Sequence, residues 1–159
     1  MSVAIRPARE TDAAFLSQSI GELQLMHATA MPSLFKPIAE PYLLEKLQIL
    51  LANPAAYLFV ADVDGSPAGF THLGLFTEPE GENNFANTKV FISYVYVHPE
   101  RRNQGIGRAL VDAARRRAQE LGVRTLELNV MAFNTKARAF FQKCGFTPLR
   151  EVLSQTLAP

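Results

Sequence analysis

The chain has 159 residues, of which 48% are apolar and 19% are charged, and 16 basic residues against 15 acidic ones give a formal net charge of +1. This composition is typical of a soluble globular chain, long enough for one domain with a single core. The near-neutral balance argues against a nucleic-acid-binding protein, whose domain is usually strongly basic.

The lone cysteine, Cys144, excludes an intramolecular disulfide framework and indicates a buried thiol in a reducing compartment. The first twenty residues carry charges such as Arg6 and Asp12 and contain no continuous apolar run. They therefore predict neither a signal peptide nor a membrane span. The sequence predicts a cytoplasmic protein with no membrane partner.

The first part of the chain predicts one strand and two helices. Residues 3–6 alternate apolar and polar side chains before Pro7, which indicates a strand. Apolar residues at helical spacing between 15 and 23 predict a helix, and leucines at three- and four-residue spacing between 43 and 51 predict a second helix. The proline-punctuated segment 26–41 between them is expected to be an ordered apolar loop.

Three strand-like runs follow. Residues 57–63 and 68–76 flank Asp64-Gly65, a strong hairpin signal because both residues tolerate positive φ. The polar segment 78–88 predicts a surface loop, and the β-branched and aromatic run 89–97 predicts the clearest strand.

The last part alternates helices and strands. A helical stripe begins at Ile106 and stops at Gly122, 124–130 predicts a strand, and a short helix ends at Gly145. A final strand is expected within 146–157. The order β-α-α-β-β-β-α-β-α-β predicts an α/β fold with a mixed, twisted sheet of about six or seven strands and helices on both faces.

The most informative segment is the turn between the strand ending at Val97 and the helix beginning at Ile106. Gly105 and Gly107 lack Cβ atoms, so their backbone can approach a ligand closely. The start of a helix offers unpaired N–H donors and a partial positive charge, which suit a phosphate group. Arginines around the turn add full charges, so a pyrophosphate is the expected guest.

Two other phosphate-binding patterns do not fit this turn. A dinucleotide-binding loop would place a third glycine at the position of Leu110. A nucleoside-triphosphate loop would place Lys and then Ser or Thr after the glycine, and this sequence has neither there. A purely structural turn with surface arginines remains an alternative.

Arg102-x-x-Gly105-x-Gly107 matches the Arg/Gln-x-x-Gly-x-Gly/Ala signature of the GNAT superfamily of N-acetyltransferases. The resemblance extends over nearly the whole chain. It includes 4–8 with Asp12-Ala13, the loop 27–37, and Leu128-Asn129-Val130 with Asn134. It continues through Ala137-x-x-Phe140-Phe141-x-x-x-Gly145-Phe146. It implies one GNAT domain spanning 1–159.

The resemblance implies a cofactor site for acetyl-CoA, with no metal. In this family the pantetheine arm lies between two splayed parallel strands, here 89–97 and 124–130. The residues expected at the cofactor are Tyr96, Val97, Arg102, Asn103, Gln104, Gly105, Ile106, Gly107, Arg108, Asn134 and Phe141. The basic run 115–117 is interpreted as a solvated helix surface, with contact to the adenosine 3′-phosphate as the alternative.

The reaction implied is direct attack of a primary amine on the thioester. The family often has a tyrosine where this chain has Phe141, and the strand 90–97 contains no carboxylate to act as a base. Tyr94, Tyr96, His72 and bound water are the remaining candidates, with packing on a half-buried sheet face as the structural alternative for the tyrosines. Tyr94 and Tyr96 are the predicted catalytic residues.

The acceptor is expected to be a small-molecule or peptide amine. Met26, His27, Phe35 and His72 are the predicted acceptor-binding residues, because acceptor choice in the family rests on such loops. Two alternatives stay open: an acyl-CoA-binding sensor without activity, and an interaction subunit whose glycine turn is structural. A homodimer is expected by family analogy only.

Overall fold

A computed structural model of the chain describes residues 2–38, 40–53 and 56–157. In chain order the elements are β1 (Val3–Pro7), the 3-10 turn η1 (Glu10–Asp12), α1 (Ala13–Ala30), α2 (Glu40–Ala52), β2 (Tyr57–Val63), β3 (Ser66–Glu78), β4 (Asn87–Val97), the 3-10 turn η2 (Pro99–Arg101), α3 (Ile106–Glu120), β5 (Thr125–Leu128) and α4 (Thr135–Lys143). Contacts divide the chain into two compact units, Met1–Asn129 and Val130–Pro159.

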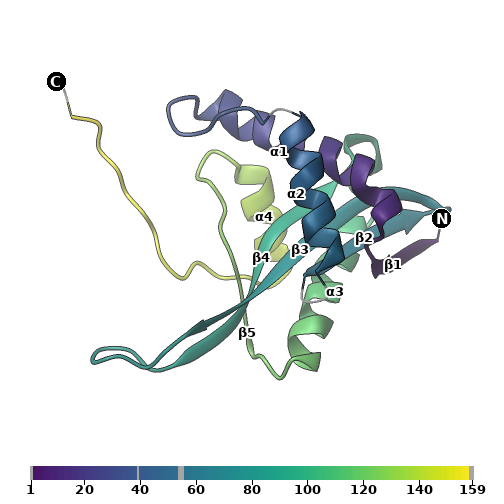
Figure 1. The fold of residues 1–159 in the computed structure, drawn as a ribbon. Coiled ribbons are helices and arrows are strands. Elements are labelled where there is room, and N and C mark those ends of the chain that lie inside the picture. Colours follow the sequence, from purple (N-terminus) through teal and green to yellow (C-terminus); the bar gives the residue numbers. More distant parts are fainter. Residues whose placement is uncertain (1, 39, 54–55, 158–159) are drawn as a thin grey trace. The chain divides into compact units, whose positions relative to one another are not determined.

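The first unit contains a mixed sheet of five strands in the order β1-β2-β3-β4-β5 (Figure 1). Neighbouring strands are antiparallel except β4 and β5, which are parallel. The predicted α/β class and the mixed sheet are confirmed, but among the described residues the sheet has five strands and not the expected six or seven. The long β3–β4 hairpin projects to the lower left of Figure 1, beyond the other strands.

The predicted hairpin turn is present between β2 and β3. Val63 pairs with Ser66, so two residues make the turn, and both have positive φ: 50° at Asp64 and 85° at Gly65. Two positive φ angles define the turn whose twist matches that of the flanking strands. Asp-Gly therefore fixes the register of this hairpin.

Helices of the first unit pack on both faces of the sheet. On one face, Leu16 and Ile20 of α1 and Leu47 of α2 cluster with Phe70 and Tyr96. On the other face, apolar side chains of α3 cluster with strand residues; this cluster contains Ala61, Val63, Ala68, Ile106 and Leu110. In the part of the chain that the structure describes, no helix combines the length and apolarity needed to cross a bilayer.

Helix α1 is longer than the sequence predicts. It continues through Met26 and His27 to Ala30, where a loop was expected from residue 26. The first proline after the helix is Pro32, so nothing in 26–30 removes a helical donor. The apolar side chains in this stretch reflect an additional helical turn, which sequence spacing alone did not separate from a loop.

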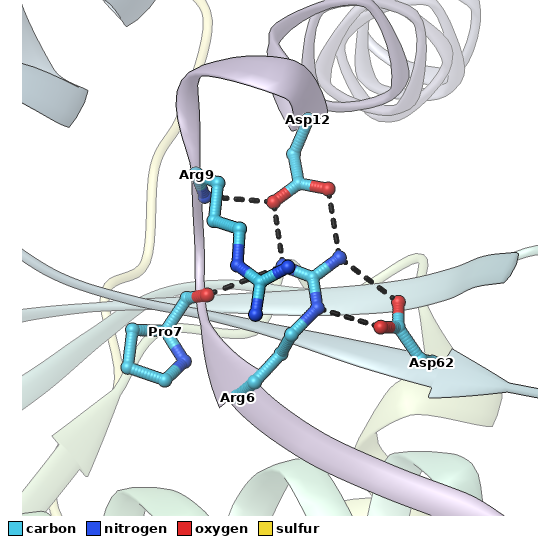
Figure 2. A network of polar contacts seen from close by, with 5 residues as sticks. All are labelled: Arg6, Pro7, Arg9, Asp12 and Asp62. Carbon is cyan, nitrogen blue, oxygen red and sulfur yellow. Dashed lines mark hydrogen bonds and ion pairs between the residues drawn. The ribbon is translucent and has the colours of Figure 1, made fainter. Parts of the chain in front are cut away.

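An ion network joins the N-terminus of the fold to β2 (Figure 2). The Arg6 guanidinium donates to Asp12 at 2.7 and 2.9 Å and to Asp62 at 2.6 and 3.1 Å. Asp12 also accepts from the Arg9 N–H at 2.7 Å. Asp12 is 3% exposed, so this network supplies the charge that the buried carboxylate needs.

The second unit contains α4 and the segment after it. Gly145 has φ 88° just beyond the helix, as its predicted helix-ending role requires. The strand predicted within 146–157 is absent from this described segment, which forms no regular element. Pro148 removes one ladder donor, and no partner strand pairs with the rest, so the apolar alternation alone did not produce a strand.

Candidate functional site

The parallel ladder between β4 and β5 is short. It runs from Lys89↔Thr125 to Ile92↔Leu128, whereas β4 continues to Val97. On the other side of β4 the antiparallel pairing shifts at the same point, because Leu73 pairs with Ile92 and His72 with Tyr94. Ser93 is therefore the extra residue of a β-bulge. Among the described residues, 93–97 have no β5 partner.

A charged triad holds the paired end of these strands together. The Lys89 ammonium on β4 lies 2.8 Å from Glu78 on β3 and 3.1 Å from Glu127 on β5. It therefore ties three neighbouring strands where the ladder is complete. Beyond this triad the ladder ends at Ile92 and Leu128, just before Ser93.

The glycine loop delivers an uncapped helix start beside the end of β4. Gly105 has φ 83° and precedes α3, and no side chain caps the helix. The first helical bond joins the Ala109 N–H to the Gly105 carbonyl at 3.0 Å, so the amides of Ile106 and Gly107 precede it. A Cβ added at Gly105 would meet nothing within 4 Å, so the positive φ is what requires glycine there.

Arg102 anchors the loop to the strand. Its Nε donates to the Val97 carbonyl at 3.1 Å, and the His98 N–H donates to the Ala68 carbonyl on β3 at 2.8 Å. The Gln104 amide bonds the Glu100 carbonyl at 3.3 Å. These contacts hold the loop in place, while residues 101–105 remain exposed to solvent.

The basic run on α3 is mostly paired within the fold. Arg115 pairs with Asp112, and Arg117 pairs with Glu120 at 2.8 Å while its guanidinium lies 4.3 Å from the Tyr57 ring centroid. These contacts agree with the interpretation of the run as a helix surface.

Gly69 on β3 is a site-positioning residue that sequence reasoning missed. A Cβ at this position would lie 2.6 Å from the Tyr96 carbonyl oxygen, 3.2 Å from Leu110 and 3.3 Å from Ile106. Only glycine lets β4 and the first turn of α3 pack this closely against β3. A glycine inside a strand-like run was the available signal.

Tyr96, predicted to be catalytic, is 3% exposed and belongs to the core under α1. Its hydroxyl donates to Glu22 Oε2 at 2.6 Å. Burial, and then the hydrogen bond to Glu22, raise the pKa of Tyr96 to about 12. A phenol with this pKa is a weaker acid than an ordinary tyrosine, which argues against Tyr96 as a proton donor to a thiolate.

Glu22 on α1 is the second residue that sequence reasoning missed. It is half-buried, and its Oε1 accepts from Gln18 at 3.2 Å while Oε2 accepts from Tyr96. Its position three residues after the buried Ser19 places it beside the core-facing stripe of the helix. That spacing was the signal available.

Tyr94 and His72 form a second pair on the same sheet face. They oppose each other across β3 and β4, and their rings stack with centroids 6.3 Å apart. Burial lowers the pKa of His72, so its imidazole is neutral at neutral pH. Its Nδ1 is buried with no hydrogen-bond partner, whereas the Tyr94 side chain is exposed.

The predicted acceptor-binding residues of the first helical region are partly brought together. The His27 Nδ1 lies 2.8 Å from the Leu23 carbonyl, and its ring lies 5.3 Å from that of Phe35. Met26 is 37% exposed and leaves apolar surface next to this pair. The contact between the His27 and Phe35 rings, called here the His27–Phe35 corner, therefore packs the segment after α1 against the last turns of the helix.

Asn134 and Phe141 belong to the second unit. The Asn134 side chain accepts from the Ala137 N–H at 3.1 Å and caps α4. The Phe141 ring lies 5.0 Å from Phe140 and 5.6 Å from Phe146. Both predicted cofactor residues thus have a structural role within their own unit.

The chain is thus an α/β protein in which α3 begins without a side-chain cap after β4, whose parallel ladder with β5 ends at Ile92. A sequence model of the acetyltransferase (GNAT) family matches residues 23–146. The chain belongs to this family.

Curated relatives include two proteins called aminoglycoside N(6')-acetyltransferase type 1. That of Klebsiella aerogenes is 31% identical over 102 residues, which are 64% of this chain and 66% of the relative. That of Stenotrophomonas maltophilia is 30% identical over 112 residues, 69% of this chain and 72% of the relative. A mycothiol acetyltransferase of Propionibacterium freudenreichii subsp. shermanii is 30% identical over 95 residues, and this chain spans only 28% of its length.

Solved structures share the fold across nearly the whole chain. A mutant of the BH1408 protein from Bacillus halodurans has a TM-score of 0.91 at 21% identity, covering 98% of this chain and 99% of that one. The structure of AAC(6')-Iy in complex with a bisubstrate analogue has a TM-score of 0.78 at 19% identity, covering 100% of both chains. At these identities the likeness describes the fold.

Proposed function

We propose that this chain transfers an acetyl group from acetyl-CoA to a primary amine by direct attack, without a metal. The observation that carries the proposal is the start of α3 at Gly105, which has no side-chain cap and follows residues 93–97 of β4, where the strand has no β5 partner. Membership in the acetyltransferase (GNAT) family supports it. The protein is proposed to act in the cytoplasm, as a monomer or homodimer.

The pyrophosphate would be held by the loop from Arg102 to Arg108. Amides at the helix start donate to phosphate oxygens, and the helix dipole favours the negative charge. The pantetheine arm would pair with the side of 93–97 that β5 leaves unpaired. Because the Val97 carbonyl already accepts from Arg102, we expect the arm to use the β4 residues before it.

The chemistry requires deprotonation of an ammonium group whose pKa is about 10. The amine nitrogen then forms a bond to the thioester carbon, and the carbon–sulfur bond breaks to release a thiolate. His72, which burial keeps neutral at neutral pH, is proposed to pass the proton through bound water to solvent. Phe141 has no hydroxyl, so solvent protonates the thiolate, whose pKa is about 8.5.

The acceptor is proposed to be a small cationic amine. The two aminoglycoside acetyltransferases among the relatives are named for acceptors of this kind. The exposed Met26 side chain and the His27–Phe35 corner would contact the acceptor body. A peptide amine is the alternative acceptor.

Calorimetric titration with acetyl-CoA tests the cofactor site. The parent should bind, and Gly105→Val should weaken binding by about tenfold or more, because the bulky residue cannot hold the positive φ at the phosphate-binding turn. Gly122→Val is the matched control: Gly122 has φ 70° at the other end of α3, and a Cβ there also meets nothing within 4 Å. It should bear similar strain and retain binding. No heat from the parent would refute the proposal.

A non-catalytic acyl-CoA sensor is the second candidate, favoured by Phe141 and by the absence of a carboxylate from 90–97. Release of free thiol from acetyl-CoA in the presence of kanamycin, spermidine or an alanine-terminated peptide separates the two functions. Turnover with any of these amines excludes the sensor. Binding of acetyl-CoA without turnover on a wider amine panel would favour it.

A further inference from the structure

Glu22 and Tyr96 form a polar pair at the edge of the core between α1 and β4. Glu22 lies on the helix, and Tyr96 lies on the stretch of β4 that has no β5 partner. The short bond of 2.6 Å between the hydroxyl and the carboxylate fixes their relative position. Ser19, which is 1% exposed, contributes a further hydrogen bond that lowers the Tyr96 pKa.

The carboxylate of Glu22 is half-buried and receives only neutral donors. One oxygen accepts from the Gln18 amide and the other from the Tyr96 hydroxyl. Within residues 2–38, 40–53 and 56–157, no ion pair reaches Glu22. A carboxylate offers about four acceptor positions, so two remain for a cation. Charges that are withdrawn from water are usually paired in proteins, and this half-buried carboxylate has no cationic partner among the described residues.

The pair also lies next to the cofactor loop. Arg102, the first residue of the glycine signature, acts on Tyr96 through space and lowers its pKa, while its Nε holds the Val97 carbonyl. Tyr94 lies two residues before Tyr96 on the same face of β4, about 7 Å away by strand geometry, and His72 opposes Tyr94 on β3. A cation bound at Glu22 would therefore lie near both the loop and the neutral imidazole.

We propose that Glu22, oriented by Tyr96, binds an ammonium group of a cationic acceptor. The ligand class is an alkylammonium, because three donors on one nitrogen can fill the remaining carboxylate positions. An acceptor carrying two or more amino groups would place one at Glu22 and present another to the thioester. The inference rests on the proposed transferase function for its role, but the binding itself does not require turnover.

The binding is tested on the full chain saturated with CoA and labelled with carbon-13 at the glutamate carboxyl carbons. The Glu22 resonance is assigned by its disappearance in Glu22→Gln. Spermidine should shift this resonance with saturation, and acetamide, an uncharged counterpart of ethylamine, should leave it in place. An unchanged Glu22 resonance at saturating spermidine, kanamycin and ethylamine would overturn the inference.

The steady-state test uses whichever of these amines the parent acetylates. Glu22→Gln should raise KM for that amine about tenfold or more, with a smaller change in kcat. Tyr96→Phe should raise KM less, since the carboxylate remains but loses its orienting donor. Glu45→Gln, an exposed carboxylate on α2, is the matched control and should behave as the parent does.

The outcomes separate the two proposals. Unchanged acetyl-CoA binding in Glu22→Gln with a raised KM supports both of them. A shifted Glu22 resonance without thiol release for any amine supports the ammonium site and refutes the transferase. Turnover by Glu22→Gln at the parent KM refutes the ammonium site alone.

Discussion

Two carboxylates associated with α1 differ in how their charge is balanced. Asp12, just before the helix, binds Arg6 through both oxygens and accepts from the Arg9 amide. Glu22, farther along the helix, accepts from only an amide and a phenol among the described residues. Where the carboxylate organises the fold, the chain supplies a guanidinium within 2.9 Å. Where the carboxylate contacts the part of β4 without a β5 partner, the residues that the structure describes supply none.

The difference distinguishes a structural charge from one kept for a ligand. Desolvation of an anion is unfavourable unless a cation or several hydrogen bonds compensate it. Asp12 has that compensation in the folded chain alone. Glu22 is compensated in part and would gain the rest from a bound ammonium group.

The largest effect on stability is expected from breaking the ion pairs of Arg6 with Asp12 and Asp62. Arg6→Met leaves Asp12 and Asp62 without their shared cation, so the free energy of unfolding should fall by about 3 kcal/mol. Urea denaturation followed by circular dichroism measures this loss. Arg116→Met, on the exposed surface of α3, should change it by less than about 0.5 kcal/mol. Equal losses in the two variants would contradict the structural role of the Arg6 network.

A second prediction concerns the packing that places Tyr96. Gly69→Ala puts a methyl group 2.6 Å from the Tyr96 carbonyl oxygen, so β4 must shift and stability should fall by about 2 kcal/mol. Gly21→Ala, one residue before Glu22, meets nothing within 4 Å inside α1 and should stabilise the protein by about 0.5 to 1 kcal/mol. In thermal denaturation, Gly69→Ala should lower the melting temperature and Gly21→Ala should raise it.

Acid should act selectively on the paired carboxylate. The hydrogen bonds from Arg6 hold the pKa of Asp12 below its ordinary value, so Asp12 stabilises the fold above its unfolded pKa of about 3.9. That contribution is lost as pH falls through the lower, folded-state pKa. Asp12→Asn should therefore flatten the decrease of unfolding free energy that the parent shows below about pH 5. A slope equal to that of the parent would contradict the assignment.

The smallest effect is expected on the pKa of one tyrosine, Tyr96. Of the four tyrosines in the sequence, Tyr96 should ionise late, since burial and Glu22 raise its pKa to about 12. Ultraviolet titration should lose this late step in Tyr96→Phe, and Glu22→Gln should lower its pKa. Because the folded-state pKa is raised, this hydroxyl stabilises the fold fully below about pH 10 and the contribution disappears as pH rises toward 12.

Features that depend on local backbone preference were predictable from the sequence. Asp64 and Gly65 form a turn with positive φ, and Gly105 and Gly122, both with positive φ, lie at the two ends of α3. These positions follow from steric limits that act within a few residues. The mixed α/β class followed from the order of such segments.

The features that escaped prediction depend on contacts between distant segments. The Tyr96–Glu22 bond joins residues 74 positions apart, and Gly69 matters because Tyr96, Ile106 and Leu110 converge on it. Neither the spacing nor the composition of the sequence specifies these long-range contacts. The strand expected in 146–157 failed for the related reason that a strand requires a partner, which alternation alone does not provide.

The extra residue at Ser93 decides which way the two tyrosines point. Side chains alternate along a strand, so one inserted position reverses the direction of every later residue. Before it, Ile92 pairs with Leu73; after it, Tyr94 and Tyr96 pair with His72 and Phe70. If Ser93 were instead a regular ladder residue, unbroken alternation from Ile92 would place both phenols on the α3 side of the sheet. The bulge that accommodates Ser93 therefore keeps Tyr96 on the face where Glu22 is its partner.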